Sequence, residues 1–111
     1  MFDFFKPKVK AYEDLSSAKF LEFSKQPDSV LIDVRSAGEF ASRKIPGALN
    51  LDVRLPDFKN QVRNLPKNKT YLLYCQGGNR SKQACAIMAE YGFETVKNLS
   101  GGITRWPFEK V

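Results

Sequence analysis

The chain has 111 residues, which is enough for one domain around a single hydrophobic core and hardly enough for two. Hydrophobic residues make up 42% and charged residues 27%, a composition typical of a globular protein rather than a disordered one. The chain contains no histidine, which excludes Ser-His-Asp and Cys-His catalytic pairs and an ordinary Cys/His zinc site. No metal site is therefore expected. No apolar run approaches the ~20 residues of a membrane helix, so no membrane span is expected either.

The net charge of +6 suits anionic partners, of which nucleic acid is one class. The lysines and arginines are scattered singly, however, with no arginine-rich run and no basic stripe interleaved with aromatic residues. We therefore interpret most of these charges as a solvated surface and expect no nucleic-acid partner. The Phe-rich segment 1–8 is not a secretory signal, because its apolar part is too short and its charges follow that part.

In chain order, the sequence predicts strands and helices in alternation. A short strand is expected at 10–12, and Ser16 or Ser17 then caps a helix that ends near Pro27. The further strands are expected at 30–34, 48–51, 70–74 and 95–98. The further helices are expected at 36–42, 55–62, 80–91 and 103–108. This order predicts an α/β fold with a central, mostly parallel five-stranded sheet and helices on both faces. We assign residues 10–108 to one domain, 1–9 to an N-terminal extension and 109–111 to a tail.

The segment from Cys75 to Arg80 carries the chemistry that the sequence predicts. Cys75 follows the buried strand 70–74, and a short loop with two glycines leads into the helix 80–91. Ligands of open α/β sheets bind at the carboxyl ends of strands, and backbone N–H groups of such a loop form a nest for an anion. The helix N-terminus and a nearby arginine favour the thiolate, which is the nucleophilic form of cysteine. Cys75 is therefore the candidate nucleophile. The candidate substrate-binding residues are Gln76, Gly77, Gly78, Asn79 and Arg80.

Three residues are expected to support this loop: Asp33, Arg35 and Ser81. Ser81 is placed to cap the helix or to donate to the loop. At the start of the helix 36–42 we expect an ion pair between Arg35 and Glu39, and we expect Asp33 to hydrogen-bond the neighbouring active loop. The second cysteine, Cys85, is interpreted as a small buried apolar residue that is too far along the helix to bridge Cys75.

The same residues resemble a known family. The loop Cys75-Gln76-Gly77-Gly78-Asn79-Arg80-Ser81 is similar to the active loop of rhodanese-like sulfurtransferases, and three further segments resemble signatures of that family. They are Leu31-Ile32-Asp33-Val34-Arg35 followed by Glu39-Phe40, then Ile45-Pro46-Gly47-Ala48-Leu49-Asn50, and finally Gly92-Phe93 through Val96 and Leu99-Ser100-Gly101-Gly102 with Trp106. The resemblance covers about residues 10–108, with all landmarks in order, and implies the rhodanese-like fold.

The resemblance implies a thiosulfate sulfurtransferase that needs no cofactor. Cys75 would take the outer sulfur of thiosulfate or another sulfane-sulfur donor as a persulfide held by the N–H groups of residues 76–80. Cyanide in an assay, or a thiol or thiol-bearing protein in cells, would then accept that sulfur, with ping-pong kinetics. Related phosphatases and arsenate reductases carry one more residue between cysteine and arginine, and that arginine would fall at Ser81. The shorter loop therefore favours sulfur transfer.

One departure from the family pattern keeps two other readings open. Gly77 stands where the family usually has serine or threonine, which removes a hydroxyl group from the loop. The alternatives are a rhodanese-fold binding or regulatory module with low turnover and a sulfur carrier that a partner enzyme loads. A reactive thiol also suggests a reducing compartment, and we expect a cytoplasmic location and a monomer or weak dimer.

Overall fold

A computed structural model describes residues 11–111, so the expected extension at 1–9 and the first residue of the expected strand at 10–12 lie outside the described residues. The strands are β1 (Glu13–Leu15), β2 (Ser29–Asp33), β3 (Leu49–Asn50), β4 (Thr70–Tyr74) and β5 (Thr95–Leu99). The helices are α1 (Ser17–Ser24), α2 (Ala37–Ser42), α3 (Phe58–Arg63), α4 (Asn79–Glu90) and the 3-10 helix η1 (Ile103–Arg105). The strands form one sheet in the order β1-β5-β4-β2-β3, and every neighbouring pair is parallel. This sheet confirms the predicted fold class.

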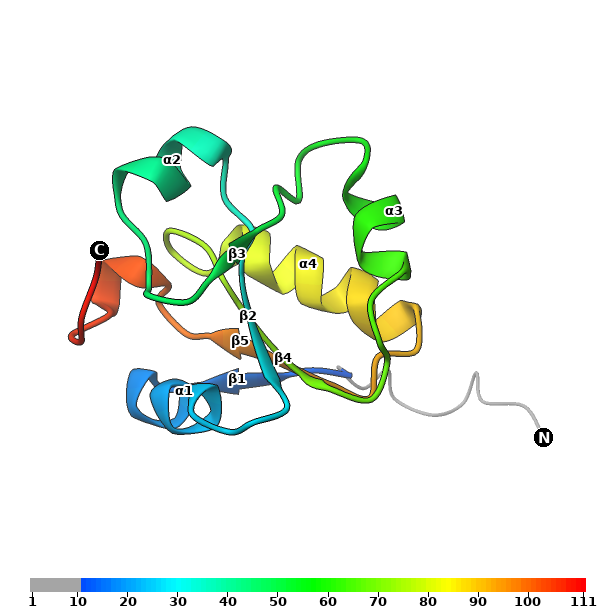
Figure 1. Cartoon of the computed structure of the whole chain (residues 1–111), viewed down its shortest axis with the longest axis horizontal. Coiled ribbons are helices and arrows are strands. Elements are labelled where there is room, and N and C mark those ends of the chain that lie inside the picture. The colour runs from blue at the N-terminus through cyan, green and yellow to red at the C-terminus, as the bar shows by residue number, and fades with distance from the viewer. Residues whose placement is uncertain (1–10) are drawn as a thin grey trace.

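Helices cover both faces of the sheet, with α3 and α4 on one face and α1 on the other (Figure 1). The central strand β4 divides its side chains between the two faces because successive residues of a strand point to opposite sides. Tyr71 and Leu73 pack with α3 and α4, whereas Leu72 and Tyr74 pack with α1 and the C-terminal segment. Because both faces are buried, β4 is an uninterrupted apolar run, and its pattern predicted the strand with its observed bounds.

The first strand lies three residues later than predicted. Ala11 and Tyr12 form a bend, and β1 begins at Glu13. The register pairs Leu15 with Leu99 of β5, and Leu15 is the only residue of β1 that is fully buried. An edge strand with one core residue and two acidic residues has no apolar periodicity, which explains the error.

Prolines changed the bounds of two predicted helices. The helix expected at 55–62 begins only at Phe58, because the residue before Pro56 is disfavoured in the α conformation. The helix expected at 103–108 is a 3-10 helix that ends at Arg105, since Trp106 is extended in front of Pro107. Trp106 is nevertheless buried and packs edge-to-face on Phe20 in the core beneath the sheet.

The C-terminal segment is attached to the body of the domain. Val111 and Lys44 exchange two backbone hydrogen bonds of 2.9 Å, and the Trp106 indole donates to the carbonyl oxygen of Glu109. The segment therefore runs beside the end of α2, on the left in Figure 1. Over residues 11–111, no helix has the length and apolar character needed to cross a membrane.

Candidate functional site

Cys75 follows directly after β4, in the loop that leads into α4. Its side chain is 1% exposed, and its sulfur accepts the Gly78 N–H at 3.0 Å. The Ser81 hydroxyl lies 3.3 Å from the same sulfur and also donates to the Gly78 carbonyl oxygen at 3.1 Å. The predicted positions of Cys75, Gly78 and Ser81 in one loop therefore correspond to direct contacts around the sulfur atom.

The backbone conformation requires glycine at only one of the two glycine positions of the loop. Gly78 has φ +110°, a conformation that favours glycine, and it turns the chain into α4 while its N–H points at the sulfur. Gly77 has no such conformation, and a Cβ built on it would meet nothing within 4 Å. A side chain at position 77 therefore fits without strain, so the loop geometry does not require this glycine.

The other N–H groups of the loop are available to a ligand. Among the hydrogen bonds of residues 11–111, none uses the backbone N–H of Gln76, Gly77, Asn79 or Arg80. The first N–H groups of a helix have no acceptor within the helix, and together with a preceding loop they form a nest for negative charge. Gln76, Gly77 and Asn79 are exposed, so solvent and small solutes reach this nest.

Asp33 and Arg35 support the loop through a chain of contacts rather than directly. The Asp33 carboxylate accepts the Arg35 backbone N–H at 2.9 Å and its guanidinium at 2.7 to 3.1 Å. Arg35 then donates to the Gln76 side chain at 3.1 Å and to the Arg43 carbonyl oxygen. The expected bond from Asp33 to the loop is therefore wrong, because Arg35 stands between the carboxylate and Gln76.

The expected ion pair between Arg35 and Glu39 is also wrong, since Glu39 binds Arg80 instead. Two hydrogen bonds of 2.7 and 3.0 Å join the Arg80 guanidinium to the two oxygens of Glu39. Glu39 also completes a capping box with Ser36 at the start of α2. Arg80 thereby ties the first turn of α4 to α2, and its charge remains close enough to interact electrostatically with Cys75.

The Glu39–Arg80 pair should make stability depend on pH. The hydrogen bonds from Arg80, and then from Ser36, lower the pKa of Glu39 from 4.5 to about 2 against the opposing effect of burial. We expect Glu39→Gln to lower the free energy of unfolding by about 1–2 kcal/mol at neutral pH, discounted for solvent screening because the Glu39 side chain is 34% exposed. Because the pKa is lower in the folded state, this contribution is present above the unfolded pKa and is lost as the pH falls toward 2.

Urea unfolding at neutral pH and at acid pH checks this expectation. The difference in the free energy of unfolding between the wild type and Glu39→Gln should shrink as the pH falls below the pKa that the Glu39 carboxyl group has in the unfolded chain. Glu94→Gln is the matched control, because Glu94 is exposed and makes no side-chain hydrogen bond or ion pair within the described residues. A difference between the wild type and Glu39→Gln that stays constant with pH would contradict the assignment.

The C-terminal segment holds the loop from outside the sheet. Ile103 and Thr104 donate their backbone N–H groups to the carbonyl oxygens of Cys75 and Gln76 at 3.0 and 3.1 Å. The Gln76 side chain donates to the Thr104 hydroxyl at 2.9 Å. A Cβ on Gly102 would overlap the Gln76 carbonyl group and approach the Cys75 carbonyl oxygen to 2.7 Å. Sequence reasoning missed Ile103 and Thr104, although the Gly101-Gly102 pair marks a close backbone approach at this point.

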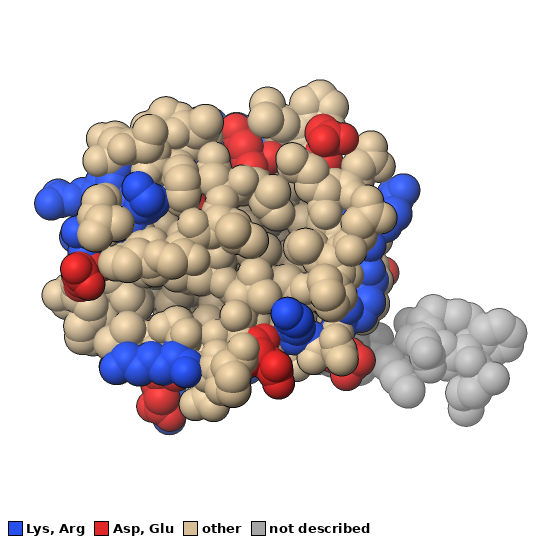
Figure 2. All heavy atoms as spheres, viewed as in Figure 1, with Lys and Arg blue, Asp and Glu red and all other residues tan. Residues whose placement is uncertain are grey.

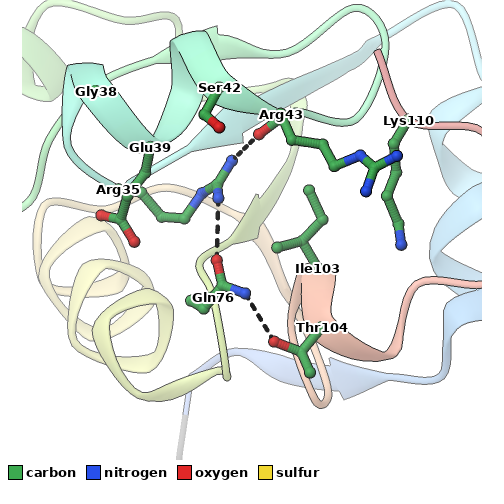
Figure 3. A pocket seen from close by; sticks show the side chains of 9 residues that line it. All are labelled: Arg35, Gly38, Glu39, Ser42, Arg43, Gln76, Ile103, Thr104 and Lys110. Carbon is green, nitrogen blue, oxygen red and sulfur yellow. Dashed lines mark hydrogen bonds between the residues drawn. The ribbon is translucent and has the colours of Figure 1, made fainter.

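A cavity of about 540 Å³ adjoins the loop at Gln76 (Figure 3). It is lined by Arg35, Gly38, Glu39, Ser42, Arg43, Gln76, Ile103, Thr104 and Lys110. Some of the basic side chains lie on the left of the face shown in Figure 2, and others lie along its right edge. Sequence reasoning did not single out Arg43 or Lys110, because nothing in a scattered charge pattern shows which charges share a cavity.

The second cysteine has no part in this arrangement. Cys85 is buried in the core between the sheet and α4, and both cysteines are free thiols. Burial raises the pKa of the Cys85 thiol, which keeps it protonated. Within residues 11–111, no group of three His, Cys, Asp or Glu side chains is placed to hold a metal ion.

Comparison with known proteins agrees with this fold. The sequence profile of the Rhodanese-like domain matches residues 16–108. A sulfurtransferase of Allochromatium vinosum is 39% identical over 79 residues, which cover 71% of this chain and 72% of that protein. The crystal structure of a rhodanese-related protein from Thermoplasma volcanium has a TM-score of 0.78 at 25% identity, covering 90% of this chain and 98% of that one. The chain belongs to the rhodanese-like domain family, which confirms the resemblance found in the sequence.

Other relatives are longer proteins that are named as hydroxylases rather than sulfurtransferases. A tRNA uridine(34) hydroxylase of Cytophaga hutchinsonii is 33% identical over 107 residues, which cover 94% of this chain but only 34% of the hydroxylase. The chain thus spans about a third of that relative. Among its relatives the chain is similar to a sulfurtransferase over 72% of that protein and to one part of a larger enzyme, and the family assignment supports sulfur transfer in general.

Proposed function

We propose that this protein is a sulfurtransferase that carries sulfane sulfur as a persulfide on Cys75. The observation that supports the proposal is the sulfur atom of Cys75 at the centre of the loop, 3.0 Å from the Gly78 N–H and 3.3 Å from the Ser81 hydroxyl. Thiosulfate or another sulfane-sulfur donor supplies the sulfur. Cyanide in an assay, or a thiol or thiol-bearing protein, accepts it.

Loading begins with the Cys75 thiolate, whose sulfur attacks the outer sulfur of thiosulfate. A bond forms between the two sulfur atoms, the sulfur–sulfur bond of thiosulfate breaks, and its electron pair leaves with sulfite. The total charge is unchanged and no oxidant is needed. The Gly78 N–H donates to the Cys75 sulfur at 3.0 Å and stabilises negative charge there, so the proposed step uses no histidine base.

Discharge reverses the direction of attack. A nucleophilic acceptor forms a bond to the outer sulfur of the persulfide, the bond to the Cys75 sulfur breaks, and its electron pair restores the thiolate. The backbone N–H groups of the loop would hold negative charge on the outer sulfur between the two steps. Sulfite leaves before the acceptor reacts and the persulfide persists between the two steps, which predicts ping-pong kinetics.

The test is the intact mass of the purified protein before thiosulfate, after thiosulfate and after cyanide. We expect a gain of one sulfur atom that cyanide removes. If thiosulfate adds nothing while the isolated protein already carries one sulfur, the protein is a carrier loaded by a partner enzyme. If sulfur is found under no condition, even with a persulfide donor, a rhodanese-fold binding module replaces this proposal.

Position 77 tests whether the loop limits the rate of loading. Gly77→Ser should fold like the wild type, because its Cβ meets nothing within 4 Å, and the added hydroxyl group can donate to the bound sulfur. We expect thiosulfate to load Gly77→Ser roughly two- to tenfold faster, the range of one net hydrogen bond. Gly77→Ala is the matched control, because it adds the Cβ without the hydroxyl. Equal acceleration in both variants would assign the effect to loop rigidity instead.

A further inference from the structure

The hydroxyl group of Ser81 lies between two acceptors. Its oxygen is 3.3 Å from the Cys75 sulfur and donates to the Gly78 carbonyl oxygen at 3.1 Å. Ser81 is fully buried in α4, so both contacts are enclosed by the protein. A hydroxyl group has one proton, so it donates to only one of these two acceptors at a time.

The protonated thiol leaves the Ser81 proton on the carbonyl group. While Ser81 donates to Gly78, its oxygen still has lone pairs that accept, and in the contact with sulfur either atom can be the donor. A chain of hydrogen bonds then runs from the Cys75 S–H through the hydroxyl group to the Gly78 carbonyl oxygen. A thiolate has no proton to donate, so ionisation of Cys75 breaks the first bond of this chain.

The carbonyl group of Gly78 keeps a partner when the Ser81 proton turns away. The backbone N–H of Lys82 donates to the same oxygen at 3.2 Å, at the start of α4. A buried carbonyl oxygen that retains one hydrogen bond avoids the penalty of a fully unpaired polar group. Rotation of the hydroxyl group toward the sulfur therefore leaves no orphaned acceptor behind.

The charge on the Cys75 sulfur determines which acceptor is the stronger. Hydrogen bonds to an ionised partner are roughly twice as strong as those between neutral groups. In the thiolate the negative charge lies on this sulfur, 3.3 Å from the Ser81 oxygen. In the thiol the sulfur is neutral, and in a persulfide the charge lies on the outer sulfur. The favoured position of the hydroxyl proton therefore differs between the thiolate and the other two states.

We propose that Ser81 is a catalytic residue whose hydroxyl group turns from the Gly78 carbonyl oxygen to the Cys75 sulfur whenever that sulfur becomes negatively charged. Its part in sulfur transfer rests on the proposed function. In discharge, the acceptor bonds to the outer sulfur, the bond to the Cys75 sulfur breaks, and the hydroxyl group donates to the electron pair that returns there. In loading, the hydroxyl group returns to Gly78 as the thiolate forms its new bond. The hydroxyl group keeps its proton throughout, so no proton is transferred.

Alkylation by iodoacetamide tests the contact without any sulfur donor. Ser81→Ala should fold, because alanine favours helices and Lys82 still donates to Gly78. We expect the ratio of thiolate to thiol on Cys75 to fall about tenfold, the size of one charge-assisted hydrogen bond. The thiolate that remains is more nucleophilic by about two- to threefold, since nucleophilicity falls as a thiolate is stabilised.

These two effects predict that the alkylation rates of Ser81→Ala and the wild type cross as the pH rises. Where the rate still increases with pH, Ser81→Ala should react about fourfold more slowly, and where the rate is level it should react about two- to threefold faster. Peptide mass spectrometry assigns the label to Cys75. The substitution leaves the charged and titratable groups described around the loop in place, namely Asp14, Asp33, Arg35, Glu39, Asp52, Arg80 and Cys85.

Ser24→Ala is the matched control, because the Ser24 hydroxyl also donates to the carbonyl oxygen three residues earlier, that of Leu21 at 2.6 Å. Ser24 lies in α1, on the other face of the sheet, and its variant should be alkylated as the wild type is at every pH. The proposal is overturned if Ser81→Ala follows the wild type at every pH. A rate lowered by one constant factor at every pH would reflect a displaced loop and would also overturn it.

Single-turnover kinetics then separate this proposal from the proposed function. At alkaline pH, where the alkylation rate is level, Ser81→Ala should be loaded by thiosulfate about two- to threefold faster and discharged by cyanide about two- to threefold more slowly. The signs differ because the Cys75 sulfur attacks in one step and leaves in the other. If sulfur is transferred and neither step changes, the role of Ser81 fails and sulfur transfer stands. If no sulfur is ever found on Cys75, sulfur transfer fails, and the crossing of the alkylation rates still decides whether Ser81 donates to the thiolate.

Discussion

Replacing Cys75 with serine should abolish sulfur transfer, with a loss of at least about a thousandfold in turnover. A serine hydroxyl is a far weaker nucleophile than a thiolate, and the loop holds no histidine that would activate it. The measurement is thiocyanate formation from thiosulfate and cyanide, together with the intact mass after thiosulfate. Because the two side chains have nearly the same shape, Cys75→Ser should keep the loop contacts of Gly78 and Ser81.

Cys85→Ala is the matched control for this substitution. It removes the other thiol from a fully buried position in the core, so we expect a stability loss of about 1 kcal/mol and unchanged sulfur transfer. If Cys75→Ser retained transfer while Cys85→Ala lost it, Cys85 would carry the sulfur. That result would contradict both the loop assignment and the buried, protonated thiol described for Cys85.

The parts of the fold that could be predicted from the sequence are those with a dense apolar signal. β2 and β4 are buried on both faces and appear in the sequence as short runs of branched and aromatic residues. α4 has an apolar face at helical spacing and ends before Gly92. Because these elements also carry the residues that flank Cys75, the position of the loop followed from them.

The parts that could not be predicted are those whose conformation depends on distant partners. β1 has one buried residue and becomes a strand only through its pairing with β5. The C-terminal 3-10 helix begins at the predicted Ile103, but it is fixed by backbone hydrogen bonds to Cys75 and Gln76, which lie almost thirty positions earlier in the chain. No local pattern in either segment contains that information.

The ion pairs of the site show the same limit at the level of single side chains. Local spacing suggested that Arg35 pairs with Glu39, four residues away at the start of α2. In the structure Arg35 turns toward Asp33 and Gln76, and Glu39 binds Arg80 of α4. Gln76 lies close to Arg35, and Arg80 close to Glu39, only because β2 and β4 are parallel neighbours whose carboxyl ends meet. The pairing of charges therefore follows from the topology of the sheet and not from the sequence separation.

Gly102→Ala should be the most damaging substitution outside the loop itself. Gly102 has φ +63° and ψ −164°, a backbone region almost restricted to glycine that costs other residues about 1–3 kcal/mol, and its Cβ would overlap the Gln76 carbonyl group. The atoms that the Cβ would meet belong to the backbone of Cys75 and Gln76, so rotating a side chain cannot relieve the clash. We expect a total loss of about 3–5 kcal/mol in the free energy of unfolding, measured by urea denaturation.

The remaining folded Gly102→Ala protein should also load sulfur more slowly. Moving Gln76 away from Gly102 stretches the hydrogen bonds from Ile103 and Thr104 that fix the loop, and misplacement of about 1 Å can cost about a hundredfold in rate. Gly92→Ala is the matched control, because Gly92 has φ +87° but its Cβ meets nothing within 4 Å. Gly92→Ala should lower the free energy of unfolding by only about 1–2 kcal/mol, the cost of the positive φ, and leave the rate of loading unchanged. Equal effects of the two substitutions would mean that the clash with the loop is relieved, and the C-terminal segment would then not control the position of Cys75.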